Sequence, residues 1–301
     1  MSILLSNEIM SAVTSELKSA TESVQIITAY CKENAIAQLD KFISSTVSEK
    51  RIMLRFSLDD LVKGSTDFSV IDFCKSRGWK VYIRFDLHAK TYIVDGKRGF
   101  VGSANATNSG LRLASHGNME MGTLIDIDNV DMEKIEALYD DAILVDNEIY
   151  SKLIDQYQSV EIENTGKQYA WDDDINQLFN PKITTLFSHE LPDKANYDNG
   201  GYIAFLDMEY NGNISAFKEA FRWSNSYLWL LNVLKENNGC LFFGAISEKL
   251  HNALVTDPKP YRKDVKQLLA NMLNLIELLQ MDDIVVDRPN YSQRVRLKEM
   301  C

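Results

Sequence analysis

The chain has 301 residues, of which 43 are acidic and 32 basic, giving a net charge of −11. This length allows two domains, each with its own core, and no apolar run approaches the roughly 18 residues that span a bilayer. An acidic net charge argues mildly against a polyanionic partner, but a local basic face can outweigh it. We therefore expect a globular protein without a membrane segment.

Cysteine usage and the absence of common motifs narrow the class further. The four cysteines are scattered and form no CxxC pair, so neither a zinc site nor a disulfide framework is expected. Residues 1–13 contain no basic residue before their short apolar run, unlike a signal peptide. No P-loop, GxGxxG or metal-ligand spacing is present. We expect a cytoplasmic protein that uses no cofactor and no metal.

The first half of the chain alternates helical and strand patterns. Asp95-Gly96 is a strong hairpin signal between two of the strands. Helices are predicted at 6–20, 34–45, 67–78 and 130–143, and strands at 23–30, 50–56, 79–85, 88–95, 98–105 and 118–127. Strands separated by helices predict an α/β sandwich around a largely parallel sheet, with hairpin strands added.

The second half is organised differently. Residues 161–200 are mixed and polar, as in a connecting region, and a short strand is predicted at 203–208. A helix at 215–239, a strand and helix within 240–254, a longer helix at 257–280 and a hairpin at 283–297 follow. This is the element order of a winged helix. We therefore predict domains at 1–160 and 201–301, the second smaller and mainly helical.

A group of chemically active residues lies within 88–105. Side chains alternate between the two faces of a strand, so His88 and Lys90 should share one face. Asn105 should arrive on the neighbouring strand, after a Gly-Ser turn whose backbone can approach a ligand closely. An imidazole, an ammonium group and an amide donor suit a phosphate diester, because phosphoryl transfer needs donors around the non-bridging oxygens.

The full spacing is more specific than these residues alone. His-x-Lys, four residues, Asp, six residues and Gly-Ser-x-Asn fit His88, Lys90, Asp95 and Asn105. This pattern resembles the signature of the phospholipase D superfamily, and the resemblance extends over roughly residues 1–150. Residues 55–73 also resemble the segment before the motif in nuclease-type members that are similar to type II restriction enzymes. The resemblance therefore implies a phospholipase D-like fold in the first domain.

The resemblance also implies a role for each motif residue. His88 would attack phosphorus and form a phosphohistidine, while Lys90 and Asn105 would hold the non-bridging oxygens. Ser103 would support the phosphate pocket. Asp95 would position the motif without taking part in the chemistry.

An acidic residue outside the motif completes the implied site. Glu120 matches the family's acidic residue that orients the histidine from behind, and Asn118 lies two residues earlier on the same predicted strand face. Without the family pattern, Glu120 would be read as a plain surface carboxylate.

The motif occurs once. His116, His189 and His251 are not followed by a lysine two residues later. Family chemistry uses two histidines, one as nucleophile and one as acid for the leaving group. The chain thus resembles the single-motif members that complete the site as homodimers, with two motifs meeting at a two-fold axis.

Basic residues gather in the predicted winged helix. Four lie at the start of the longer helix, where a recognition helix meets DNA, and four lie in the hairpin; they are Lys259, Arg262, Lys263 and Lys266, and Arg288, Arg294, Arg296 and Lys298. A basic island on an acidic chain favours DNA binding. The alternative is a helical domain with a solvated charged face that serves dimerisation or a protein partner.

The sequence as a whole predicts a homodimeric phosphodiesterase that needs no metal, most readily a DNA endonuclease in restriction or phage defence, a setting that the resemblance alone implies. The alternatives are a phosphodiesterase acting on RNA or phospholipid, and a DNA-binding or scaffold protein without turnover. The complete motif argues against the scaffold, and the absence of a membrane segment argues against lipid.

Overall fold

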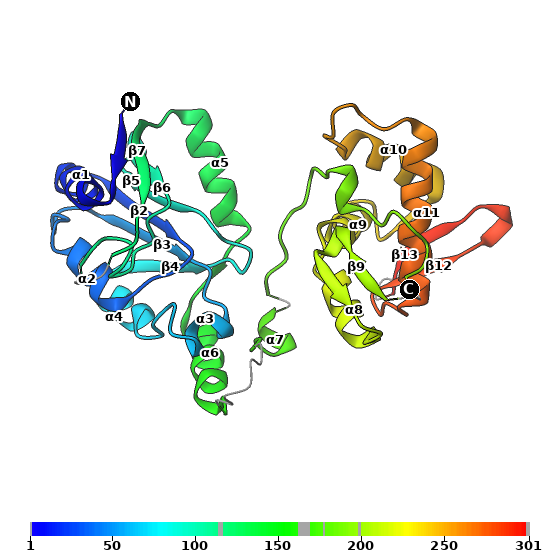
Figure 1. Cartoon of the computed structure of the whole chain (residues 1–301), viewed down its shortest axis with the longest axis horizontal. Helices are drawn as coiled ribbons and strands as arrows, with labels where there is room; N and C mark the ends of the chain where they lie inside the picture. The colour runs from blue at the N-terminus through cyan, green and yellow to red at the C-terminus, as the bar shows by residue number, and fades with distance from the viewer. Residues whose placement is uncertain (1, 114–116, 162–168, 177, 198–199, 299–301) are drawn as a thin grey trace. The chain divides into compact units, whose positions relative to one another are not determined.

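A computed structural model describes residues 2–113, 117–161, 169–176, 178–197 and 200–298. The chain divides into two compact units, Met1–Asn180 and Pro181–Cys301, shown with their helices and strands labelled in Figure 1. Each unit has its own hydrophobic core. Within the described ranges, no helix is long and apolar enough to cross a membrane.

An eight-stranded sheet forms the centre of the first unit. From one edge to the other its strands are β1 (Ile3–Leu5), β7 (Met121–Asp126), β6 (Arg98–Gly102), β5 (Lys90–Val94), β2 (Ser23–Thr28), β3 (Glu49–Leu54), β4 (Trp79–Ile83) and β8 (Ile143–Leu144). Only the β2–β3 and β3–β4 pairs are parallel. The predicted α/β class is confirmed, but the sheet is mixed, whereas a largely parallel one was predicted.

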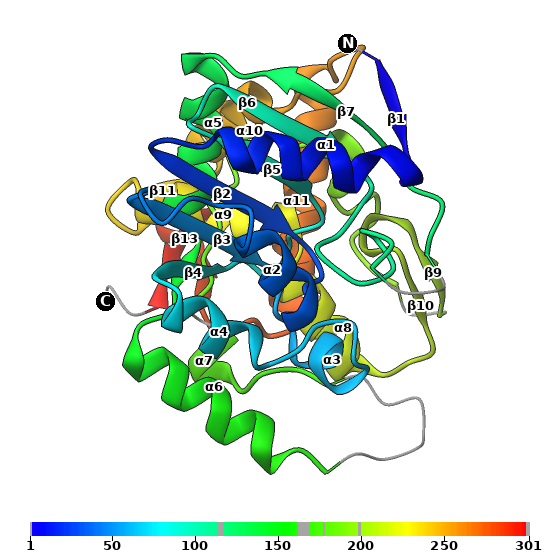
Figure 2. The same ribbon diagram turned by 90° about the vertical axis from the view of Figure 1, so that its left-hand side faces the viewer.

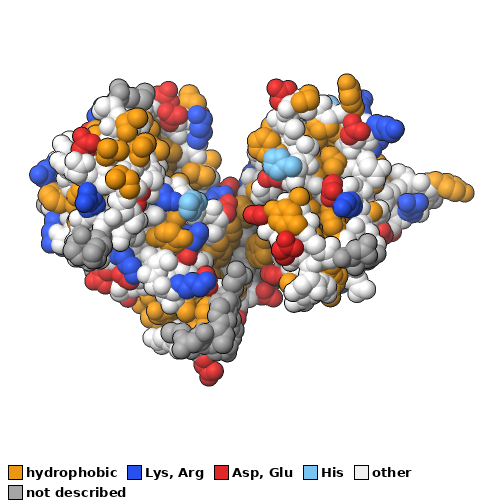
Figure 3. Space-filling view, in the orientation of Figure 1, with side chains coloured by type: hydrophobic (Ala, Val, Ile, Leu, Met, Phe, Trp, Pro, Cys, Tyr) orange, Lys and Arg blue, Asp and Glu red, His pale blue; other side chains and the backbone are white. Residues whose placement is uncertain are grey.

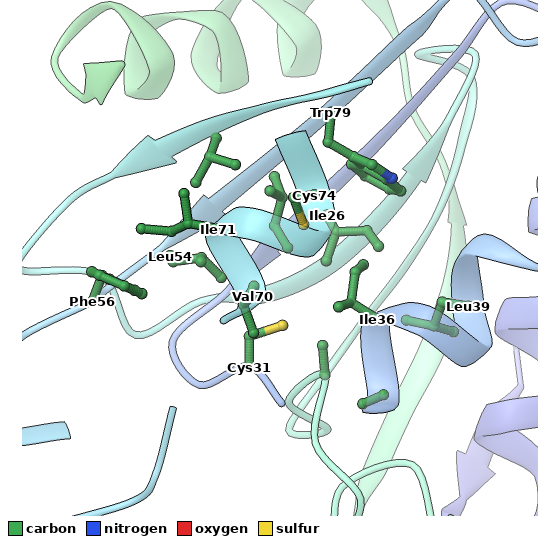
Figure 4. Close-up of a cluster of buried hydrophobic side chains, with 14 of the residues drawn as sticks. Ile26, Cys31, Ile36, Leu39, Leu54, Phe56, Val70, Ile71, Cys74 and Trp79 are labelled. Carbon is green, nitrogen blue, oxygen red and sulfur yellow. The ribbon is translucent and has the colours of Figure 1, made fainter. Parts of the chain in front are cut away.

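Helices cover both faces of this sheet (Figures 1 and 2). They are α1 (Ser6–Ser19), α2 (Glu33–Asp40), α3 (Leu58–Val62), α4 (Val70–Ser76), α5 (Asn129–Asp140), α6 (Asn147–Ser159) and the short α7 (Asp173–Asn176). Because side chains alternate along β2, Ile26 joins the core under α1, α2 and α4, whereas Ile27 joins a smaller core under α5. Figure 4 shows the packing of α2 and α4 onto the first of these cores.

The predicted hairpin is present and fixes the register of the motif strands. Asp95 and Gly96 both have positive φ, 52° and 60°, as a tight hairpin turn requires. Val94 pairs with Arg98 and Thr91 with Val101.

The segment after α6 belongs to the first unit. Trp171, Ile175 and Phe179 are buried in its core, and the Trp171 indole donates a hydrogen bond of 3.0 Å to the carbonyl oxygen of Phe56. Leu186 and Leu191 are buried in the core of the second unit. The region expected at 161–200 to connect two domains therefore contributes to both cores, on either side of the boundary after Asn180.

The second unit packs helices against a three-stranded antiparallel sheet. Its elements are β9 (Gly201–Ile203), β10 (Met208–Tyr210), α8 (Ile214–Arg222), α9 (Asn225–Lys235), β11 (Cys240–Phe242), α10 (Phe243–Ala253), α11 (Arg262–Leu278), β12 (Ile284–Asp287) and β13 (Arg294–Leu297), with short 3₁₀ turns at Ser188–Glu190, Ala204–Leu206 and Pro289–Tyr291. The strand order in the sheet is β11-β13-β12.

Two sequence predictions for this unit were wrong in detail. The strand expected at 203–208 is interrupted by the 3₁₀ turn Ala204–Leu206. The helix expected at 215–239 is two helices, because the Ser224 side chain caps α9 by accepting a hydrogen bond from the backbone of Tyr227. An apolar stripe continued across the break and concealed it.

Candidate active site

The candidate site lies at one end of the strands of the first sheet, where β2 and β3 end and β5 begins. We call this end the carboxyl edge of the sheet. Thr28, the last residue of β2, pairs with Leu54 at the end of β3 and with Lys90 at the start of β5. Residues just beyond these three therefore meet at one edge. The carboxyl ends of parallel strands are where open α/β sheets bind ligands.

Lys90 places a cation at this edge. Its side chain is largely buried, with the residue 8% exposed, and its Nζ donates a hydrogen bond of 2.6 Å to the carbonyl oxygen of His88. Desolvation by burial lowers the pKa of Lys90, the charge of Arg55 lowers it further, and the charge of Glu120 partly opposes both. Among the described residues, no carboxylate lies within ion-pair distance of the ammonium group, so a bound anion would be its natural partner.

His88 is exposed and precedes β5. The strand predicted at 88–95 spans only Lys90–Val94, so His88 lies outside β5 and strand alternation alone does not align it with Lys90. The two residues are instead connected by the bond from the lysine side chain to the histidine carbonyl. The imidazole is therefore carried by a loop, and the buried cation is bonded to the backbone of the same residue.

Asn105 is fixed by hydrogen bonds to its amide oxygen. Its Oδ1 accepts bonds from the backbone nitrogen of Tyr30, at 3.1 Å, and from the Thr28 hydroxyl, at 3.2 Å. A backbone N–H can only donate, so the oxygen faces Tyr30 and the Nδ2 group remains as a donor for a ligand. Asn105 lies three residues beyond β6, where Ala106 forms a bridge with Cys31, whereas a position on the strand was predicted.

Ser103, Asn118 and Glu120 form a hydrogen-bonded group in which Glu120 is buried and the other two are exposed. The Ser103 hydroxyl donates a short hydrogen bond to one carboxylate oxygen of Glu120, and the Asn118 amide donates to the other at 3.1 Å. Glu120 is 6% exposed, and its backbone nitrogen donates to the hydroxyl of Ser6 at 2.6 Å. The residue is therefore no plain surface carboxylate. Within the described ranges it makes no hydrogen bond to His88, so the expected direct orientation of the histidine is not seen.

Gly102 allows close packing of two strands. A Cβ on Gly102 would lie 2.5 Å from the Met121 carbonyl oxygen and 2.7 Å from the Phe100 ring, and a Cβ on Gly122 would lie 2.2 Å from the same ring. The Gly-Ser sequence was expected to let the backbone approach a ligand. The contacts show that both glycines make room for the Phe100 ring and the neighbouring backbone.

Asp95 lies outside the site. Val94 pairs with Val24, whereas Lys90 pairs with Thr28, so Asp95 lies at the opposite end of β5. Its carboxylate accepts hydrogen bonds from the backbone nitrogens of Thr21, Glu22 and Ser23 at 2.8–3.2 Å. This arrangement ties the β5–β6 turn to the start of β2, in line with the positioning role that the motif implies.

Sequence reasoning missed a second group at the same edge. Arg55 follows β3 directly, and its guanidinium binds Asp60 through two bonds of 2.6 Å and donates to the Tyr30 hydroxyl at 2.7 Å. Tyr30 in turn bonds Asn105. The available signal was positional, because Tyr30 and Arg55 each stand just beyond the carboxyl end of a predicted parallel strand.

The basic residues of the second unit fall into two sets. Those before and within the first two turns of α11, together with Arg288 and Lys298, are exposed; the α11 set is Lys259, Arg262, Lys263 and Lys266. Arg294 and Arg296, in contrast, both form ion pairs with Asp287, at 2.8 and 3.2 Å. These bonds lower the pKa of Asp287 to about 2, the bond from Arg294 contributing most. The hairpin is therefore less basic than its sequence indicated.

Known proteins resemble the first part of the chain. A family model described as "Cardiolipin synthase, PLD-like domain" matches residues 13–142. Among solved structures, NucT from Helicobacter pylori is 19% identical with a TM-score of 0.36, over 46% of this chain and 92% of that chain. A phospholipase D family member, Nuc from Salmonella typhimurium, is 18% identical with a TM-score of 0.37, over 48% of this chain and 96% of that chain. No protein in the curated set matches the sequence.

The matched region contains every motif residue from His88 to Asn105 and the buried Glu120, on a mixed sheet with helices on both faces. Residues 13–142, within the first unit, therefore form a phospholipase D-like domain.

Proposed function

We propose that the protein is an endonuclease that cuts phosphodiester bonds of nucleic acid, most readily DNA, through a phosphohistidine intermediate. The observation that carries this proposal is the buried ammonium group of Lys90. Its hydrogen-bond partner is a backbone carbonyl oxygen, and the described residues supply no carboxylate to pair with it. A buried, unpaired cation beside an exposed imidazole and an oriented amide donor suits a phosphate diester.

The proposed reaction has two steps. A ring nitrogen of His88 attacks phosphorus, a P–N bond forms, and the P–O bond to the leaving oxygen breaks while that oxygen takes a proton from a second, protonated imidazole. Water then attacks the phosphohistidine, the P–N bond breaks, and the water proton returns to the second imidazole. Lys90 and the Nδ2 of Asn105 neutralise charge on the two non-bridging oxygens.

Glu120 and Ser103 support the site from beneath in this proposal. Glu120 lies close enough to act on the pKa of Lys90, and its carboxylate is fixed by Ser103 and Asn118. We infer that Glu120 acts on the histidine only when substrate has drawn the imidazole inward.

The second imidazole comes, in this proposal, from a second copy of the chain. Five exposed apolar side chains gather on the sheet face opposite α1, and we call them the β1–β7 patch: Ile3, Leu5, Val101, Met119 and Met121, between 40% and 84% exposed. Figure 3 shows hydrophobic side chains over the part of the first unit where β1 and β7 lie.

The pairing of the strands places the patch close to the site. Leu5 pairs with Met121, and the backbone nitrogen of Ser103 bonds the Met121 carbonyl oxygen at 2.9 Å. Clustered exposed apolar residues mark protein interfaces. An isologous dimer through this patch would bring two copies of the motif towards one two-fold axis.

For the second unit we propose a winged helix that binds DNA. The order α9, β11, α10, α11, β12, β13 and the exposed cations on α11 support this proposal. A protein partner for this unit is the competing proposal, since the ion pairs of Asp287 reduce the charge of the hairpin.

The proposed function is tested by incubating the protein in EDTA with plasmid DNA, single-stranded DNA, RNA and phospholipid vesicles. The expected result is cleavage of DNA without a metal ion, because the histidine, lysine and amide supply the nucleophile and charge neutralisation that metal ions provide elsewhere. The His88→Ala protein is the control and should cut nothing. Activity that EDTA abolishes and magnesium restores would refute the mechanism.

A further inference from the structure

Arg55 is held more firmly than a surface arginine. Its Nε and Nη2 bind the carboxylate of Asp60, its Nη2 also reaches the Tyr30 hydroxyl, and the guanidinium stacks on the Tyr30 ring with 4.7 Å between centres. Asp60 is itself 5% exposed and accepts a hydrogen bond from Ser57. The guanidinium therefore loses little further freedom when it binds a ligand.

The backbone beside Arg55 adopts an unfavourable conformation. Phe56 has a φ of 48°, in the left-handed region that bulky residues rarely occupy. Its carbonyl oxygen accepts the bond from the Trp171 indole, and Ser57 then caps α3. Strained residues that are locked by their surroundings occur preferentially at functional sites.

One edge of the guanidinium is open to a ligand. All hydrogen bonds that Arg55 makes within the described ranges use Nε and Nη2. Nη1 makes none of these bonds and is not fully buried, and the side chain as a whole is 24% exposed. Two N–H donors therefore face accessible space beside an ion pair that fixes their direction.

This edge lies two strands from the donors assigned to the scissile phosphate. Leu54 and Lys90 pair with opposite sides of Thr28, which separates their backbones by about 10 Å at the usual strand spacing. Tyr30 spans the interval, bonded to Arg55 by its hydroxyl and to Asn105 by its backbone nitrogen. The positive charge of Arg55 also lowers the pKa of Lys90, so both cations act on the same region.

We propose that Arg55 binds a second phosphate, next to the one that is cleaved, and so selects a chain of phosphodiesters as the substrate class. This inference rests on the proposed function, in which Lys90 and Asn105 already hold the scissile phosphate. A phosphodiester with one phosphate leaves Arg55 unused, whereas a polynucleotide places a neighbouring phosphate within reach. The pair with Asp60 and the contact with Tyr30 position the guanidinium for that group.

The test compares two substrates with the wild-type and Arg55→Gln proteins. One is a DNA oligonucleotide, and the other is thymidine 5′-(4-nitrophenyl phosphate), a diester with a single phosphate. Loss of a charged hydrogen bond should raise KM for the oligonucleotide about 10- to 100-fold and reduce kcat/KM for the small diester by a much smaller factor. The matched control is Arg98→Gln, which removes an arginine paired with Glu16 and Asp126 at the other end of the sheet.

A second measurement keeps the result independent of folding. A methylphosphonate in place of one neighbouring phosphate removes the charge that Arg55 would bind. It should weaken binding to a His88→Ala protein about tenfold or more and weaken binding to the His88→Ala, Arg55→Gln protein much less, as a double-mutant cycle requires. The Arg55→Lys variant, which keeps the charge, should recover part of the difference.

The outcomes separate the two proposals. A wild-type protein that cuts neither substrate would refute the proposed function itself. Cleavage of both substrates with an equal loss in Arg55→Gln, or an unchanged methylphosphonate penalty at every neighbouring phosphate, would overturn the role of Arg55 and leave the proposed function standing.

Discussion

The buried ammonium group of Lys90 destabilises the folded state of the chain. Burial is the main cause of its lowered pKa, and Arg55 adds to the effect. The unfolded chain therefore binds the proton more tightly than the folded chain, so the stability of the fold should rise as pH increases from the lowered pKa towards the ordinary value of 10.5. Substrate affinity should change in the opposite direction, because a deprotonated Lys90 cannot neutralise phosphate.

Replacing this residue should separate stability from function. Lys90→Met removes the buried charge, so the free energy of unfolding at neutral pH should rise by on the order of 1 kcal/mol, while turnover of DNA is lost. Thermal denaturation in the absence of DNA measures the first effect and a plasmid-cutting assay the second. A lower melting temperature for Lys90→Met would show that the ammonium group stabilises the fold.

At the scale of single elements, the turn between β5 and β6 depends on Asp95. Desolvation would raise the pKa of this carboxylate, but hydrogen bonds from the backbone of Ser23 and Glu22 and from Thr21 together outweigh it and lower the pKa. The stabilisation is therefore complete above the ordinary value of 3.8 and is lost as pH falls through the lowered pKa.

Asp95→Asn tests this clamp with little change in shape, since asparagine also tolerates a positive φ. We expect the free energy of unfolding to fall by about 1–2 kcal/mol at neutral pH. The difference from the wild-type protein should shrink in strongly acidic solution, where the carboxylate is protonated as well. Urea titrations at both pH values provide the comparison, and a constant difference would assign the loss to another cause.

The two basic elements of the second unit, α11 and the β12–β13 hairpin, differ in how far their cations are available to DNA. The cations at the start of α11 are exposed, whereas Arg294 and Arg296 are engaged by Asp287. Replacing Arg262 and Lys263 by alanine should therefore weaken DNA binding and reduce its salt dependence by about two counterions. Replacing Arg294 and Arg296 should have a smaller effect. Equal and unchanged salt slopes in both variants would favour a protein partner for this unit.

How well the sequence predicted the site depended on the distance between partners in the chain. The motif, the hairpin turn and the positioning role of Asp95 follow from residues close together in sequence. The partnership of Ser103 with Glu120, and that of Arg294 with Asp287, depend on which strands lie side by side and in which register. Neither register is visible in a single sequence, so Asp287 was overlooked although it faces Arg294 directly.

At the scale of the whole molecule, the proposal requires two chains for one site. Wild-type protein is mixed with an excess of His88→Ala protein under conditions that let subunits exchange. If each dimer holds one composite site, activity should fall towards the square of the wild-type fraction, because a mixed dimer has a single His88. Enzyme assays across a series of mixing ratios give the curve, with unmixed wild-type protein at matched concentration as the control.

A linear decrease would mean that each chain works alone. The proton for the leaving group would then come from within the chain. His116 would be the first residue to replace, although it lies outside the described residues. Charged substitutions in the β1–β7 patch, such as Met121→Lys, should convert dimers to monomers in sedimentation experiments if the patch is the interface.

The contact between Trp171 and Phe56 decides where the chain can be cut when the first unit is placed in a fusion protein. The family match ends at residue 142, and a cut near 160 would look safe on the sequence. Such a fragment would lack the indole that secures the turn beside Arg55, and the buried Phe179 as well. The smallest portable piece should therefore extend to Asn180, where the first unit ends. A shorter fragment should retain the proposed reaction of His88 but bind a polynucleotide more weakly.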